Sequence, residues 1–132
     1  MICVAKFDRY FEIDEANSLL PKLRPLLERI RKAAKGLGNE IGREEVEALA
    51  RAARSNGGGA EASARWEGFA QLMELVKEVH EEGVLVKDLH AGLLDFPAWR
   101  DGREILLCWR ADEDEIRFWH DLDSGFSGRQ PI

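Results

Sequence analysis

Apolar side chains recur every three or four residues between positions 14 and 37, and this spacing predicts a long amphipathic helix. The stripe is formed by Leu20, Leu23, Leu26, Leu27, Ile30, Ala33, Ala34 and Leu37. Asp14 is suited to the N-cap, because its carboxylate can accept hydrogen bonds from the first free amide groups. Pro21 and Pro25 lie inside the stripe and predict a kink or a restart, since proline has no amide hydrogen.

A second apolar stripe with the same spacing predicts another long helix, from residue 60 to residue 82. It is formed by Phe69, Leu72, Val76 and Val79. Between the two stripes, residues 44–54 favour a short helix and the glycine-rich residues 55–60 a mobile loop. We therefore expect an antiparallel helical hairpin over about residues 14–82.

From residue 84 onward the apolar positions follow a strand pattern, which predicts an antiparallel sheet over about residues 84–122. The expected strands are 84–87, 93–96, 103–110 and 115–121, and Asp101-Gly102 is a tight-turn signal. The tail, 123–132, is expected to be irregular. The chain is thus interpreted as one α+β domain, 1–132, with a helical hairpin followed by a three- or four-stranded sheet.

The last two predicted strands allow a register to be proposed. A short loop centred on Asp112 and Glu113 would place Ile105 opposite His120. In that register Cys108 and His120 point to opposite faces of the sheet. A bulge or a three-residue loop would change this pairing.

Charge is distributed unevenly along the chain. Residues 1–60 carry 11 Lys and Arg against 9 Asp and Glu, whereas residues 61–132 carry 8 against 16. A net charge of −6 does not favour nucleic acid, because phosphate binding depends on clustered basic residues. We expect the basic first helix to lie beside the acidic second helix.

Composition and cysteine usage favour a cytosolic protein. With 45% hydrophobic and 33% charged residues the balance is globular, and no apolar run approaches the roughly 20 residues that a membrane span needs. The first residues are too quickly charged for a signal peptide. Cys3 and Cys108 lie far apart and are expected to be free thiols.

His120 is the histidine that best fits a functional role, because it lies between Trp119 and an aspartate on a half-buried strand. Its neighbour Asp121 would point to the opposite face, so Asp95 or Glu104 would have to be the carboxylate partner. The alternative is a packed, hydrogen-bonded histidine.

Arg129 is a candidate for binding an anion. It follows two glycines, which allow close backbone approach to a carboxylate or phosphate. The alternative is a salt bridge to Asp121, Asp123 or Asp95 that fixes the tail to the sheet.

No spacing among the histidines, cysteines and carboxylates is a known metal-ligand motif, so no metal site is predicted. Asp95 and His120 are weak candidates for a divalent ion. Cys108 is interpreted as a small core residue. No catalytic residue and no cofactor can be named.

The chain resembles a bacterial family known only as domain of unknown function 2203. The resembling segments are Phe11-x-Ile13-Asp14-Glu15-Ala16-Asn17-x-Leu19-Leu20-Pro21, Gly83-x-x-Val86-Lys87-Asp88, Gly92-Leu93-x-Asp95-Phe96-Pro97, Gly102-Arg103, Leu107-Cys108-Trp109, Glu113, Trp119-His120 and Gly125-Phe126-x-Gly128-Arg129-x-Pro131. This resemblance implies no activity and no site residues.

The leading hypothesis is a non-catalytic, homodimeric binding protein. A small anionic ligand or partner segment would be held near Asp95, Trp119, His120 and Arg129. One alternative is a metal-assisted hydrolase that uses Asp95 and His120. Another is a structural assembly module that associates through its helices.

Overall fold

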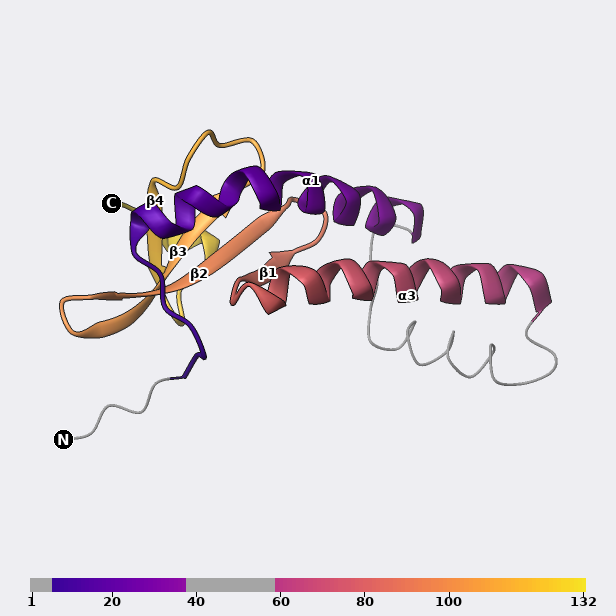
Figure 1. Cartoon of the computed structure of the whole chain (residues 1–132), viewed down its shortest axis with the longest axis horizontal. Helices are drawn as coiled ribbons and strands as arrows, with labels where there is room; N and C mark the ends of the chain where they lie inside the picture. The colour runs from indigo at the N-terminus through magenta and orange to yellow at the C-terminus, as the bar shows by residue number, and fades with distance from the viewer. Residues whose placement is uncertain (1–5, 38–58) are drawn as a thin grey trace.

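The computed structural model describes residues 6–37 and 59–132, with side chains from residue 65 onward in the second stretch. Two long helices are followed by an antiparallel sheet, as the α+β prediction requires (Figure 1). The elements are α1 (Ile13–Leu37), α3 (Gly59–Glu81), β1 (Leu85–Asp88), β2 (Leu93–Arg100), β3 (Arg103–Arg110), β4 (Phe118–Asp121), the 3-10 helix η1 (Phe126–Gly128) and β5 (Gln130–Pro131). Within the described residues, no helix combines the length and the apolar character needed to cross a membrane. The short helix predicted at 44–54 and most of the predicted loop lie outside the described residues, whereas residues 59 and 60 are already helical.

Helix α1 begins slightly before the predicted position and runs without interruption through both prolines. Asp14 lies inside its first turn, so the predicted N-cap is wrong by two positions. Glu12, the residue immediately before the helix, instead donates its backbone N–H to the side chain of Glu15 at 3.2 Å. This hydrogen bond is one half of a capping box. The predicted restart at the prolines does not occur. The buried residues of α1 form one apolar core together with α3 and the sheet, and this packing holds the helix together there.

The sheet has five strands in the order β1-β2-β3-β4-β5, one more than the upper prediction, because the tail adds β5 beside β4. One face packs against the helices and forms the core with them. Its strand residues include Leu94, Phe96, Ala98, Ile105, Leu107, Trp109 and Trp119. We call the opposite face, which carries the alternate residues, the outer face.

The predicted pairing of the last two long strands is wrong by one residue. His120 lies opposite Leu106 rather than Ile105, and this shift moves every side chain of β4 to the other face. The cause is the connection 111–117, which is longer than a tight turn and is bound to α1. Asn17 accepts a hydrogen bond from the backbone N–H of Ile116, and Arg24 donates to the carbonyl groups of Glu113 and Asp114.

Strand β2 continues through Pro97, where the prediction ended it. The carbonyl of Pro97 accepts a hydrogen bond from the N–H of Phe11 at 2.7 Å, on the side away from β3. The nitrogen of the same residue points to that side too, so no bond between β2 and β3 is lost. The Asp101-Gly102 turn is confirmed, with positive φ at both residues and Arg100 paired with Arg103.

Candidate functional site

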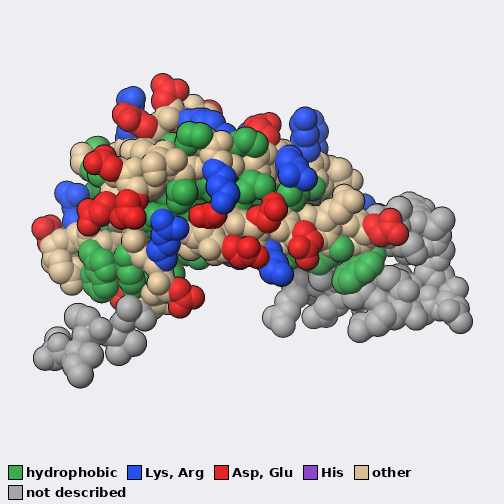
Figure 2. Space-filling view, in the orientation of Figure 1, with side chains coloured by type: hydrophobic (Ala, Val, Ile, Leu, Met, Phe, Trp, Pro, Cys, Tyr) green, Lys and Arg blue, Asp and Glu red, His purple; other side chains and the backbone are tan. Residues whose placement is uncertain are grey.

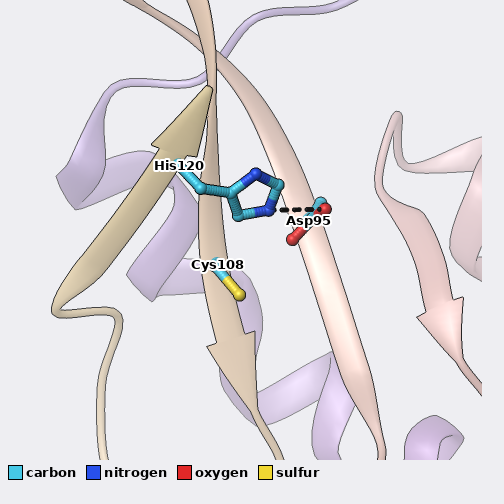
Figure 3. Close-up of side chains that lie close together, drawn as sticks. All are labelled: Asp95, Cys108 and His120. Carbon is cyan, nitrogen blue, oxygen red and sulfur yellow. Dashed lines mark hydrogen bonds and ion pairs between the residues drawn. The ribbon is translucent and has the colours of Figure 1, made fainter. Parts of the chain in front are cut away.

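Three polar side chains meet on the outer face of the sheet (Figure 3). Asp95 on β2 lies directly opposite Cys108 on β3, and His120 on β4 is one pair further along the same face. The carboxylate, thiol and imidazole each offer an atom within 4.8 Å of the other two, and all three residues are buried. Neighbouring strands thus bring together three groups that are distant in sequence.

The ring of His120 is held at both nitrogens. Nδ1 lies 2.7 Å from the carbonyl oxygen of Asp121, and Nε2 lies 3.0 Å from Oδ2 of Asp95. A carbonyl oxygen accepts only, so Nδ1 carries a hydrogen. One further proton is then shared between Nε2 and Asp95, which confirms Asp95 as the predicted carboxylate partner. The other predicted partner, Glu104, accepts from the hydroxyl of Tyr10.

Asp95 is a buried carboxylate with spare acceptor capacity. It is 2% exposed, and burial raises its pKa while the adjacent His120 opposes the rise. Its second oxygen, Oδ1, accepts no hydrogen bond of ordinary geometry from the described residues, although the Cys108 thiol lies close enough to influence its pKa. A buried oxygen without a hydrogen-bond partner lowers the stability of the fold by about 1–3 kcal/mol. Such an oxygen indicates a position where a ligand or ion could bind.

Cys108 belongs to the site, which the sequence reasoning missed. The mistaken register placed Cys108 and His120 on opposite faces, whereas the structure places them on the same face. Burial raises the pKa of its thiol to about 12, and Asp95 adds to the rise. Cys108 is therefore a free, buried thiol at neutral pH. The absence of a Cys-x-x-Cys or similar spacing left no sequence signal for its role.

A pocket of about 110 Å³ adjoins the three side chains. It is lined by Lys87, Leu93, Asp95, Cys108, His120, Leu122, Gly125 and Phe126. That volume holds a few water molecules or one small ion with its remaining ligands. Lys87 is the second element of this site that the sequence reasoning did not single out.

Arg129 and Trp119, the other predicted ligand-binding residues, are not among the residues that line this pocket. The guanidinium of Arg129 donates to Glu113 and to the carbonyl of Cys108, and it stacks over the rings of Phe118 and Phe126. It fixes the tail to the sheet, but through Glu113 rather than through one of the predicted aspartates. Trp119 packs into the core on the helix-covered face. Of the four predicted residues, the structure thus brings together Asp95 and His120.

Comparison with known proteins assigns the chain to a family. The model of the uncharacterized conserved protein family DUF2203 matches residues 9–132, and the chain belongs to that family. No curated protein and no solved structure shows significant similarity to the chain. The residues that could act chemically are therefore identified by geometry alone.

Proposed function

For this member of an uncharacterised family, we propose a non-catalytic binding function, with the ligand held in the outer-face pocket by Asp95, Cys108 and His120. The observation that carries the proposal is Oδ1 of Asp95, a buried acceptor without an ordinary hydrogen-bond partner beside a pocket. His120 cannot turn away from the site because both of its ring nitrogens are bonded. The site is rigid and incomplete, which is what a preorganised binding site requires.

The charge of the site selects the kind of ligand. Asp95 presents an acceptor to the pocket, so the ligand should offer positive charge or a hydrogen-bond donor. This differs from the anion that the sequence favoured, because Arg129 is occupied by Glu113. Lys87 is the one basic residue among those lining the pocket, apart from His120 itself.

The pocket favours binding over hydrolysis. A metal-assisted hydrolase needs room for its substrate and a group that transfers protons. Among the residues lining the pocket, Asp95 and His120 are hydrogen-bonded to each other, and no other carboxylate or imidazole is present to transfer protons. The volume of about 110 Å³ is also far below that of a pocket for an organic substrate.

Native mass spectrometry of the full chain, isolated under gentle conditions, tests this function. We expect a reproducible excess over the polypeptide mass that disappears on denaturation. In D95N the excess should be lost, whereas H90N, which changes an exposed histidine, should retain it. An excess that is equally present in D95N, or no excess in the wild-type chain, would overturn the proposal.

We also propose that the protein associates with a second copy through the groove between the helices. This groove of about 650 Å³ is lined by Arg29, Lys32, Ala33, Ala70, Gln71, Glu74, Leu75 and Glu78. Its α1 side is basic and its α3 side acidic, and Figure 2 shows hydrophobic side chains between them. A twofold partner would place each basic side against the acidic side of the other copy.

Charge reversal tests the association without disturbing the core, because the four charged side chains are exposed. Changing Arg29 and Lys32 to Glu should yield a monomer in sedimentation experiments. Adding Glu74→Lys and Glu78→Lys should restore the dimer. A monomeric wild-type chain would contradict the proposal, and so would a dimer that persists in both the double and the fourfold variant.

The redox state of the site suggests where the protein acts. Cys108 is a free thiol in the structure, and free thiols persist in the reducing cytosol. We therefore propose a cytosolic location. Fractionation of cells that express the full chain tests this, and recovery outside the cytosol would contradict it.

A further inference from the structure

We infer that the outer-face site binds a divalent transition-metal ion of the zinc type, with Asp95, Cys108 and His120 as its three protein ligands. This inference rests on the proposed binding function and names its ligand. It stands first on geometry, because the three ligand atoms lie within 4.8 Å of one another on three neighbouring strands. Ligand atoms around a tetrahedral zinc ion are about 3.3–3.8 Å apart, so only small side-chain movements are needed to bind the ion.

The donor set selects the class of metal. One carboxylate oxygen, one imidazole nitrogen and one thiolate sulfur suit zinc and its borderline neighbours. Calcium and magnesium require oxygen ligands and would not use the sulfur of Cys108. The set therefore favours zinc, cobalt or nickel over the abundant hard cations.

The hydrogen bond made by Nδ1 of His120 is the kind expected of a metal-binding histidine. Metal-binding histidines usually donate their other ring N–H to a carbonyl or carboxylate, which fixes the ring and its tautomer. His120 makes this bond from Nδ1 to the carbonyl of Asp121 at 2.7 Å. Nε2 is then the atom that faces Asp95 and Cys108, and it would bind the ion.

The charge of the bound ligands selects a divalent ion. Metal ligands bind in their deprotonated forms, so Asp95 and Cys108 each contribute one negative charge and His120 contributes none. A 2+ ion leaves the buried site neutral, whereas a 1+ or 3+ ion would leave it charged. Binding releases the thiol proton and the proton shared by Asp95 and His120, so the atoms and charges balance.

The pocket supplies the fourth position. It adjoins all three ligands and is lined on its other sides by Leu122, Phe126 and neighbouring residues. A site with three protein ligands and one open position keeps an exchangeable water or small ligand. The ion would also bind the oxygen of Asp95 that the protein leaves without an ordinary partner.

Cobalt substitution tests the inference on the full chain. The protein is kept reduced, stripped of metal with a chelator, and titrated with Co²⁺ alone. We expect one ion per chain, the visible bands of tetrahedral cobalt and a thiolate-to-cobalt charge-transfer band, all of which Zn²⁺ abolishes. No binding, or binding without the charge-transfer band, would overturn the inference.

Matched variants assign the ligands. C108S should lose the charge-transfer band, and D95N and H120N should weaken binding by more than the about 10- to 100-fold that loss of an outer hydrogen bond causes. C3S and H90N, which change the other cysteine and an exposed histidine, should bind as the wild type does. Loss of the band in C3S, or its persistence in C108S, would overturn the assignment.

X-ray absorption of the zinc-loaded wild-type chain does not depend on variant folding. We expect one sulfur and the remainder nitrogen or oxygen neighbours, and any other sulfur count would contradict the site. Failure of the metal inference is distinguishable from failure of the proposed function. An organic mass excess that D95N abolishes would retain the binding function and exclude the metal.

Discussion

Oδ2 of Asp95 lies 3.0 Å from Nε2 of His120, although twenty-five positions separate the two residues along the chain. Both side chains are buried, and the hydrogen bond between them requires one proton. The contact joins β2 to β4 across the intervening strand β3. It therefore combines a structural role with a chemical one, and the two can be separated by substitution.

Asp95→Asn should destabilise the metal-free protein less than Asp95→Ala. The amide of asparagine can donate to Nε2, so we expect a loss of about 1 kcal/mol in the free energy of unfolding. Alanine leaves the ring nitrogen without a partner and adds a cavity, so we expect about 2–4 kcal/mol. Urea unfolding measures both. Equal losses would mean that neither the hydrogen bond kept by asparagine nor the cavity left by alanine affects stability.

Arg129→Ala should destabilise the protein strongly, because it leaves the largely buried carboxylate of Glu113 without its charged partner. The two side chains are 12% and 15% exposed, and removing one partner of such a pair costs about 3–5 kcal/mol. The double variant with Glu113→Ala should lose less than the sum of the single changes.

The matched control for Arg129 is the exposed pair of Arg117 and Glu115 at 3.3 Å. Arg117→Ala should cost less than about 1 kcal/mol, because exposed ion pairs contribute little. If Arg129→Ala were as mild as Arg117→Ala in urea unfolding, the tail would not be fixed by the pair with Glu113.

The thiol of Cys108 should make the metal-free protein unstable at high pH. Its pKa is about 12 in the folded chain against an ordinary value of 9.0, so the unfolded chain releases this proton first as the pH rises. The thiol leaves the free energy of unfolding unchanged below pH 9 and lowers it by about 1.4 kcal/mol per pH unit between the two values.

Cys108→Ala isolates that effect. The difference in free energy of unfolding between the two chains, measured at a series of alkaline pH values, should change steadily above pH 9. A constant difference would show that the thiol has an ordinary pKa in the folded protein.

Two glycines with similar backbone conformations should differ in their tolerance of alanine. Gly92 and Gly102 have φ of 73° and 79°, so alanine is strained at both by about 1–2 kcal/mol. At Gly102 the added methyl group meets open space, whereas at Gly92 it lies 3.0 Å from both Ala111 and Arg31. Gly92→Ala should therefore cost about 1–3 kcal/mol more in thermal or urea unfolding. Equal costs would mean that these neighbours move aside freely.

The helices and the approximate strands could be predicted from the sequence, because their apolar periods are strong and local. The hairpin at Asp101-Gly102 was equally predictable, since a two-residue turn with positive φ leaves few alternatives. Asp95 could also be identified as a possible partner of His120. These features depend on the chain near each residue or on simple alternation.

The position of Cys108 in the site could not be predicted, because it depends on contacts far away in sequence. Asn17 and Arg24 of α1 hold the connection 111–117 in place through hydrogen bonds to its backbone. The residues of the connection itself contain no turn motif from which these bonds could be predicted. A one-residue error there exchanges the two faces of β4. The same error hid the convergence of the thiol with His120.

Pro97 also affects how the molecule meets other chains. Strand β1 pairs with β2 only as far as Leu85, which lies opposite Asp95, so β1 does not cover the part of β2 that follows Asp95. An uncovered strand edge is a template for intermolecular pairing. Pro97 has no hydrogen to donate at that margin, and its carbonyl is already occupied by Phe11. An incoming strand finds neither donor nor acceptor at this residue. The proline thus protects the sheet from edge-to-edge aggregation.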